Sequence, residues 1–343
     1  MKQTFLLELP NGPFGDPLVI VRIRWSPRVL LLDAGEMAAV GPRTLLETTD
    51  VLVTHAHVDH VFGLARLLRQ RIGRLERPLR IFGPPGLAAR ISAHLQGYHW
   101  NLVPAYPIDL AVVEVHSDRC EWWRFPRQQG FEPRLDAVED GPEEGPVLDD
   151  DLLSIEARLL EHGSIPTVAW RLREHRSYHI DPVRLREMGF EPGPWITHLK
   201  QEFRRQRDRQ ALVRLPDGRE WQLGHLEDSL VRIREGDSLV YASDLAPSRE
   251  NLSRLAFFAT GVRRLVIEAH FLEEHAALAQ EHAHLTALLA GSIARQAGVQ
   301  AVCPLHFSTR YENRIEEIFT EVKRGAGTVS LEDLPSSPEP SAG

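Results

Sequence analysis

The chain has 343 residues, with 40 Lys+Arg against 48 Asp+Glu and a formal net charge of -8, which is typical of an ordinary globular protein without a general attraction for nucleic acid. No apolar run reaches the roughly 18 residues that a membrane span needs, and Glu8 interrupts the N-terminal stretch that a signal peptide would require. Cys120 and Cys303 are too few for a disulfide framework. We therefore expect a cytoplasmic protein without a membrane partner, in which Cys303 is an inert core residue.

Short apolar runs, polar loops and helical patterns follow one another along the first hundred residues. Strands are expected at 19–24, 29–32, 51–53 and 79–82, with one helical pattern after residue 60 and another that ends near Gln96. This alternation predicts a layered α/β sandwich.

Two segments depart from that pattern. Residues 127–150 contain many acids and two Gly-Pro pairs, which predicts a solvated surface loop. Residues 173–222 have weaker apolar periodicity and more proline and charge, which predicts an inserted arm.

The apolar pattern then resumes. Strands are expected at 238–242, 264–268 and 300–304, and helices at 271–281, at 286–297 and after residue 311. Residues 1–330 would form one catalytic domain around the arm, and residues 331–343, with three prolines among Ser and Glu, predict a disordered tail.

The loop after the third expected strand has an unusual density of metal-binding side chains. His55, His57, Asp59 and His60 lie within six residues, directly before a helical pattern. In an extended loop His55 and His57 project to one side, and the turn into the helix brings Asp59 and His60 to an adjacent point. The spacing therefore allows two metal ions.

This motif and its strand–loop–helix setting resemble the metallo-β-lactamase superfamily, whose members bind one or two transition metals at the edge of an αββα sandwich. The resemblance implies further ligands downstream. His162, Asp244 and His306 each end a strand-like run, in the order that the superfamily uses. The fold class implied is α/β, a metallo-β-lactamase αββα sandwich with an inserted arm.

Within the superfamily the chain most resembles the ribonuclease Z family, endonucleases that trim the 3′ trailer from precursor tRNA. Residues 306–311, His-Phe-Ser-Thr-Arg-Tyr, look like the family signature around the last metal-binding histidine. Residues 33–36, Asp-Ala-Gly-Glu, are similar to an early family motif, and Glu268 with the later His284 resembles the catalytic segment. Residues 191–194, Glu-Pro-Gly-Pro, resemble the Gly-Pro element of the family's tRNA-gripping arm.

The resemblance implies two metal ions, a homodimer and a role for each site residue. One ion would be held by His55, His57 and His162 and the other by Asp59, His60 and His306, with Asp244 as the bridge. Nitrogen and oxygen ligands suit Zn²⁺, with Mn²⁺ or Fe as alternatives. A hydroxide activated by the metals would attack the phosphodiester, and Asp59 would accept its proton.

The family's acid catalyst is not at its usual place. Ile267 replaces the histidine of the family's His-Glu-Ala-Thr motif, and Leu285 interrupts His-Ser-Thr. Glu268, His270 and His284 are the candidates for protonating the leaving oxygen. The alternative is a polar cluster that supports the metal ligands.

A basic run lies in the expected arm. It consists of Lys200, Arg204, Arg205, Arg207 and Arg209, which would bind RNA phosphates. Glu202 and Asp208 lie between these cations, so the alternative is a solvated helix face.

Three functions remain open at this point. The first is a phosphodiesterase that acts on precursor tRNA or a related RNA. The second is a small-molecule hydrolase of the same fold, acting on a cyclic nucleotide, thioester, sulfate ester or lactone. The third is a non-catalytic, metal-stabilised binding protein, against which the presence of every expected ligand weighs.

Overall fold

The computed structural model describes residues 3–71, 78–100, 110–126, 130–142, 145–205 and 208–335. It divides into two compact units: Met1–Arg173 with Ser238–Gly343, here called the main unit, and Glu174–Asp237, here called the arm. Each has a hydrophobic core of its own, so they are described in turn. No helix among these residues is both long and apolar enough to cross a membrane.

The first sheet of the main unit has eight strands that lie in chain order. They are β1 (Phe5–Glu8), β2 (Val19–Ile23), β3 (Val29–Leu32), β4 (Thr48–Leu52), β5 (Leu79–Gly83), β6 (Leu110–Val115), β7 (Arg119–Arg124) and β8 (Arg134–Asp140). Strands β3 to β6 run parallel, so their carboxyl ends meet at one edge of the sheet. Parallel strands covered on both faces read as continuous apolar runs, as β3 does.

The second sheet has seven strands in the order β19-β18-β17-β16-β11-β10-β9. Their bounds are β9 (Leu148–Asp149), β10 (Leu153–His162), β11 (Ile165–Glu174), β16 (Ser238–Ala242), β17 (Arg264–Glu268), β18 (Ala301–Leu305) and β19 (Ser330–Leu331). Strands β16, β17 and β18 run parallel and β11 runs antiparallel to β16. The end of β10 therefore lies at the same edge as the carboxyl ends of β16 to β18, and the amide of Ala246 donates to the carbonyl of Glu161 there.

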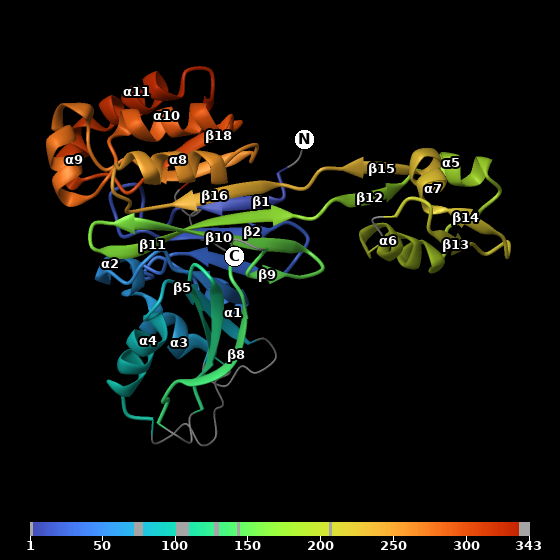
Figure 1. Ribbon diagram of the computed structural model, residues 1–343, viewed down its shortest axis with the longest axis horizontal. Helices are drawn as coiled ribbons and strands as arrows, with labels where there is room; N and C mark the ends of the chain where they lie inside the picture. Colours follow the sequence, from blue (N-terminus) through green and yellow to red (C-terminus); the bar gives the residue numbers. More distant parts are fainter. Residues whose placement is uncertain are drawn as a thin grey trace, which may run out of the picture. The chain divides into compact units, whose positions relative to one another are not determined.

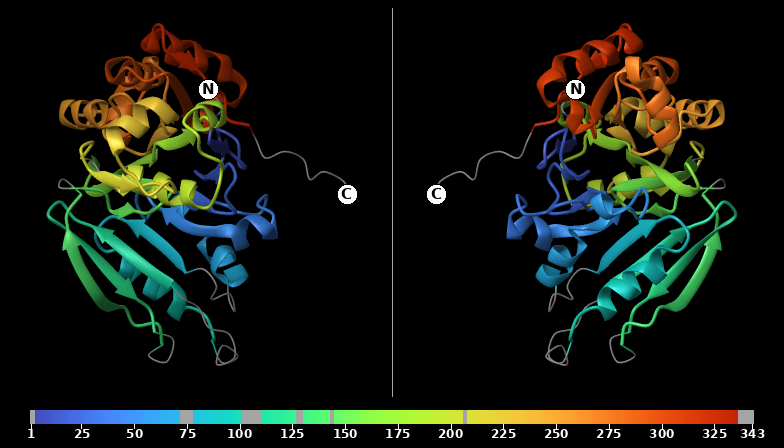
Figure 2. Two further views of the ribbon diagram at one scale, coloured as in Figure 1. Left: turned by 90° about the vertical axis from the view of Figure 1, so that its right-hand side faces the viewer. Right: turned by 90° about the vertical axis from the view of Figure 1, so that its left-hand side faces the viewer.

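Three hydrophobic clusters separate four layers. The inner cluster joins the sheets and includes Phe82 and Val113 from the first and Trp170 and Val266 from the second. One outer cluster joins the first sheet to α1 (Pro42–Glu47), α3 (Leu64–Arg71) and α4 (Leu87–Gln96). The other joins the second sheet to α8 (Arg249–Phe258), α10 (Ala287–Ala297) and α11 (Ile315–Ala326). The two sets of helices cover opposite faces of the paired sheets (Figures 1 and 2), so the expected αββα sandwich is confirmed.

The prediction of a solvated loop over 127–150 is wrong in part. Strand β8 pairs antiparallel with β7, and β9 pairs with β10. Every residue of β8 is exposed, because it is an edge strand whose backbone pairs while its side chains stay in water. No apolar alternation therefore marked it in the sequence. Residues 127–129, 143 and 144 lie outside the described residues.

The arm extends beyond the predicted boundary at residue 222. Its elements are β12 (Ser177–Ile180), α5 (Pro182–Glu187), α6 (Trp195–Arg205), β13 (Leu212–Arg214), β14 (Glu220–Gln222), α7 (Leu223–Leu230) and β15 (Val231–Arg234). Strand β15 pairs with β12, and the buried leucines of α7 belong to the arm's own core. The apolar residues of α7 and β15 thus serve a second small core, which a one-dimensional pattern does not distinguish from the main one.

The tail begins later than residue 331. Strand β19 pairs with β18, Leu334 is buried, and the amide of Leu9 donates to the carbonyl of Pro335 at 2.9 Å. Residues 331–335 are therefore ordered against the main unit, which corrects the prediction for them. Residues 336–343, the rest of the predicted disordered tail, lie outside the described residues.

Candidate metal centre

The histidine-rich loop lies where two parallel strands end. Strand β4 ends at Leu52, and α2 (Val58–Val61) begins after His57, which is its N-cap. Asp33 follows the neighbouring strand β3, and its amide donates to the carbonyl of Leu52 at 2.9 Å. This pairing brings the carboxylate of Asp33 under the loop.

Asp33 organises the loop from below. Its Oδ1 accepts hydrogen bonds from the amide of Thr54 at 2.7 Å and from the Thr54 hydroxyl at 3.0 Å. Its Oδ2 lies 2.8 Å from Nδ1 of His60 and accepts a 2.6 Å hydrogen bond from the Tyr241 hydroxyl. The carboxylate of Asp33 holds the His60 ring through Nδ1, so Nε2 faces the opposite direction, as in many metal-binding histidines.

The remaining predicted ligands come from the second sheet. His162 is the last residue of β10, Asp244 follows β16 and His306 follows β18. The carbonyl of Ala283 lies 3.0 Å from Nδ1 of His162 and fixes the direction of its ring. All the predicted ligands therefore converge on the edge at which these strands end.

Two groups of ligand atoms form at this edge. One contains His55, His57, His162 and Asp244, and the other contains Asp59, His60 and His306, with the atoms of each group within 4.8 Å of one another. In the second group Oδ2 of Asp59 lies 3.5 Å from Nε2 of His60 and 3.6 Å from Nε2 of His306. Apart from Asp244, which the family resemblance makes the bridge, these are the residues that the resemblance assigns to the two ions.

Asp244 lies between the two groups. Its Oδ2 is 3.6 Å from Nε2 of His55 and 3.8 Å from Nε2 of His162 in the first group, and 3.5 Å from Nε2 of His60 in the second. Its Oδ1 is 2.7 Å from Nδ1 of His306 and accepts from the Ser243 hydroxyl at 2.9 Å. One carboxylate thus faces imidazoles of both groups.

The donor atoms fit a transition-metal ion. The Nε2 atoms of His55 and His60 are buried and have no hydrogen-bond partner in the part of the chain that the structure describes, which is costly unless a cation completes them. Burial and the neighbouring His60 lower the pKa of His55 to about 2, so its imidazole is neutral, as a metal ligand must be. Neutral nitrogens beside carboxylate oxygens suit Zn²⁺ or a related ion.

The backbone holds this arrangement at a conformational cost. Asp33, Asp244 and His306 have φ angles of 57°, 55° and 55°, in the left-handed region that residues other than glycine rarely adopt. Such positions persist where the surrounding structure imposes them, and they cluster at functional sites. Asp33 and His306 directly follow parallel strands and Asp244 stands two residues after one, where the chain turns to aim a side chain along the edge.

The three candidates for acid catalysis also meet at this edge. Glu268 ends β17, and its Oε2 lies 2.8 Å from Nδ1 of His284. The amide of Leu245 donates to the other oxygen of Glu268 at 2.8 Å. A further group of ligand atoms, all within 4.8 Å of one another, comes from Glu268, His270, His284 and His306.

His270 reaches the site although it stands three positions after the family's usual histidine. Its Nδ1 lies 3.0 Å from the carbonyl of His306, and its ring stacks on that of His284 with centroids 4.1 Å apart. Ile267, at the family's histidine position, is instead buried among the helices that cover the second sheet. Burial and the nearby His284 lower the pKa of His270 to about 3, whereas Glu268 outweighs burial and raises the pKa of His284.

The predicted RNA-binding residues are placed less completely. Lys200 is half-buried on α6, and Arg204 and Arg205 end that helix. Arg209 pairs with Glu227 and Asp228 of the arm, each at 2.7 Å. Arg207 lies outside the described residues.

Two residues of the centre are not among the site residues predicted from the sequence. Asp33 stands only within the Asp-Ala-Gly-Glu motif, and Tyr241 has no predicted role. The position of Asp33 after a strand next to the histidine loop was an available signal. Tyr241 had none, because its hydroxyl meets Asp33 only through the packing of one sheet on the other.

No family model matches the chain. A ribonuclease Z from Deinococcus radiodurans is 33% identical to it over 304 residues, which covers 88% of each chain. The metallo-β-lactamase fold protein YhfI from Bacillus subtilis aligns with a TM-score of 0.55 at 13% identity, covering 97% of this chain and 95% of YhfI. The short form of human tRNase Z aligns with a TM-score of 0.51 at 17% identity, covering 90% of this chain and 93% of its own. The two structures confirm the metallo-β-lactamase fold, and the identity and coverage of the Deinococcus relative show that this chain belongs to the ribonuclease Z family.

Proposed function

We propose that this chain is a metal-dependent endoribonuclease that removes the 3′ trailer of precursor tRNA, or processes a related RNA. Family membership supports the reaction and the substrate class. The observation that carries the proposal is the position of Asp244, whose Oδ2 lies 3.6, 3.5 and 3.8 Å from imidazole nitrogens of His55, His60 and His162. A carboxylate that faces both ligand groups suits a two-metal centre for phosphodiester hydrolysis.

The two ligand groups support a place for each ion. His55, His57 and His162 would hold one, Asp59, His60 and His306 the other, and Asp244 would bridge them. Zn²⁺ is the ion that we expect, with Mn²⁺ or Fe as alternatives. When bound, two such ions lower the pKa of a shared water and neutralise charge on the phosphodiester oxygens.

Asp59 is suited to take the proton of the attacking water. Its side chain is 36% exposed, so substrate and water reach it. Burial raises the pKa of Asp59, but the hydrogen bond with His306 and the charge of His60 have the larger effect and lower that pKa to about 2. The carboxylate is therefore ionised at neutral pH, the form that can bind a metal ion and accept a proton.

His284 is suited to protonate the departing nucleoside oxygen. Glu268 holds its Nδ1 at 2.8 Å, which leaves Nε2 for the substrate. Glu268 itself is fixed by the amide of Leu245 and is fully buried, so the pair has one orientation. His270, stacked on His284, would hold that ring in place or share the proton transfer.

The partners and the location follow from the family and the composition. An RNA substrate, a homodimer and a cytoplasmic location are the expectations. Both cysteines are free and buried, in keeping with a reducing compartment. Sedimentation of the purified protein at several concentrations tests the dimer.

One observation favours a second candidate, hydrolysis of a small ester on the same fold. Arg209, one of the five predicted RNA contacts, is engaged by Glu227 and Asp228. A cation that is already paired with acids of its own arm adds little to RNA binding.

The test is an assay of the zinc-loaded protein on precursor tRNA with a 3′ trailer, beside bis-p-nitrophenyl phosphate and a thioester. The proposal expects one cut that leaves a tRNA body with a 3′ hydroxyl. His57→Ala should lower this turnover by several powers of ten, because one imidazole is lost from the centre. His99→Ala, at an exposed residue outside every ligand group, is the matched control. If the protein hydrolyses a small ester but leaves precursor tRNA uncut, the result would favour the second candidate instead.

A further inference from the structure

A fourth group of ligand atoms lies apart from the residues of the metal centre. We propose that Glu114, His116 and Glu121 form an additional binding site for one divalent transition-metal ion, at the hairpin between β6 and β7. Their ligand atoms lie within 4.8 Å of one another, and the group shares no residue with the other three groups found among the described residues.

The hairpin places three ligands on one face of the first sheet. Glu114 and Glu121 are directly opposite each other in the antiparallel pair, and His116 stands two residues after Glu114. Val113 and Val115 point into the cluster between the sheets, so Glu114 points to the other face. The amide of His116 donates to the carbonyl of Arg119 at 2.9 Å and closes the turn, which gives the three side chains a rigid base.

Two like charges directly opposite each other destabilise a strand pair unless a cation lies between them. Among the residues that the structure describes, one oxygen of each carboxylate accepts a hydrogen bond. Oε1 of Glu114 accepts from the amide of Ala88 at 2.7 Å, and Oε1 of Glu121 accepts from Nε of Arg119 at 2.7 Å. These contacts fix the two carboxylates and leave both Oε2 atoms on the side of His116, as the outer partners of metal ligands do.

The distances suit ligands of a common ion better than a direct ion pair. Nε2 of His116 lies 3.5 Å from Oε2 of Glu114 and 3.5 Å from Oε2 of Glu121. An imidazole that donated to either carboxylate would lie at about 2.7–2.9 Å. Two ligand atoms at about 2.1 Å from one tetrahedral Zn²⁺ lie about 3.4 Å apart.

Burial adds a second, independent indication. The side chain of Glu114 is 7% exposed, and Nε2 of His116 is buried without a hydrogen-bond partner. A buried imidazole nitrogen with no hydrogen-bond partner among the described residues, beside a largely buried carboxylate, is unfavourable unless a cation completes the group. Three protein ligands leave coordination positions for water, as in open zinc sites.

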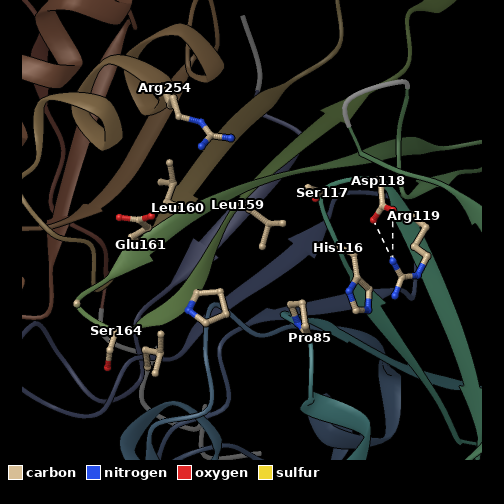
Figure 3. A pocket seen from close by; sticks show the side chains of 13 residues that line it. Pro85, His116, Ser117, Asp118, Arg119, Leu159, Leu160, Glu161, Ser164 and Arg254 are labelled. Atoms are coloured by element: carbon tan, nitrogen blue, oxygen red, sulfur yellow. Dashed lines mark hydrogen bonds and ion pairs between the residues drawn. The ribbon is translucent and has the colours of Figure 1, made fainter.

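An ion has a route to these residues. A pocket of about 540 Å³ lies beside the hairpin, and His116, Asp118 and Arg119 line one side of it. Figure 3 shows these residues facing Glu161 and Arg254 on the other side. Of the three proposed ligands His116 lines the pocket, so the site adjoins it, while the side chains of Glu114 and Glu121 are only 7% and 15% exposed.

The experiment measures zinc content rather than activity. Metal-free protein is dialysed to equilibrium against Zn²⁺ alone, and bound zinc per chain is determined by mass spectrometry of the element. His116→Ala should bind one equivalent less than the wild type at saturation. His99→Ala, at an exposed residue outside the group, should bind as much as the wild type.

Two further variants make the result decisive. Glu121→Gln keeps the size of the side chain and should also lose one equivalent, so the test holds if His116→Ala fails to fold. His57→Ala removes a residue of the other centre. This variant should still bind the zinc ion of the hairpin site, which His116→Ala loses. Equal zinc content in the wild type and in folded His116→Ala or Glu121→Gln would overturn the proposal and leave His116 as a histidine held between two carboxylates.

Discussion

The hydroxyl of Tyr241 donates a 2.6 Å hydrogen bond to Oδ2 of Asp33, and both side chains are fully buried. The two residues belong to different sheets, since Tyr241 lies on β16 and Asp33 follows β3. The same oxygen accepts from His60, whose other nitrogen faces Asp59 and Asp244. A polar contact across the sandwich therefore positions a residue of the metal centre.

Tyr241→Phe should lower the free energy of unfolding by about 1.5–3 kcal/mol, because it removes a hydrogen bond to a buried carboxylate. Burial and the charge of Asp33 raise the pKa of Tyr241 well above its ordinary value, so the hydroxyl remains a donor. Urea unfolding of the metal-free protein measures the change. Tyr98→Phe, at a tyrosine that is 48% exposed, is the control and should change little. Equal stability of the Tyr241 variant and the wild type would contradict this account.

Asp33→Asn should weaken zinc binding at the centre by about 10–100-fold. The amide no longer offers two carboxylate oxygens, so Nδ1 of His60 loses its charged acceptor and Nε2 is no longer kept free for a metal. Competition with a chromophoric chelator gives the affinity, and a His116→Ala background removes the hairpin site from the measurement. Asp208→Asn, at an exposed residue of the arm, should leave the affinity unchanged, and an unchanged affinity for Asp33→Asn would refute the positioning role.

The site residues that follow strands could be predicted from the sequence because runs of apolar residues predict those strands. His162, Asp244 and His306 each stand where an apolar run ends, and parallel strands bring such ends to one edge. Strand β8 could not be predicted in this way, because all its side chains are exposed and only its backbone pairs with a neighbouring strand. The contact of Tyr241 with Asp33 depends on the packing of two sheets, for which no local pattern exists.

His284→Ala should reduce turnover of precursor tRNA by about 10²- to 10⁴-fold, the usual contribution of a general acid. Turnover of bis-p-nitrophenyl phosphate should fall much less, because p-nitrophenolate leaves without a proton. The ratio of the two rates, measured with zinc-loaded protein, is therefore the informative quantity.

The control for this prediction is His99→Ala, which should leave the ratio unchanged. His270→Ala should lower the precursor tRNA rate by a smaller factor than His284→Ala, and should change turnover of bis-p-nitrophenyl phosphate little, if its ring only holds His284 by stacking. Equal losses on both substrates in His284→Ala would mean that the Glu268–His284 pair supports the metal ligands and does not protonate the leaving group.

Both thiols should resist alkylation in the native protein at pH 8. Burial, with Glu139 nearby, raises the pKa of Cys120 from 9.0 to about 11, and burial, with Glu332 nearby, raises that of Cys303 to about 12. Since these folded-state values exceed the ordinary value, the thiols' contribution to stability is complete below pH 9 and is lost as the pH rises through 11 to 12. Mass spectrometry after iodoacetamide treatment should find label only in guanidinium-unfolded protein; label on the native chain at pH 8 would contradict the burial of these residues.

Replacing Arg204, Arg205 and Arg207 together with Ala should weaken RNA binding and reduce the slope of log affinity against log salt by about 0.7 for each lost single-strand phosphate contact. These guanidiniums would contribute binding remote from the reacting phosphorus, so KM for precursor tRNA should rise while turnover of a small diester stays constant. Arg209→Ala is the control: its side chain already pairs with Glu227 and Asp228, so it should leave the slope unchanged. An unchanged slope in the triple variant would mean that the basic run is a solvated helix face.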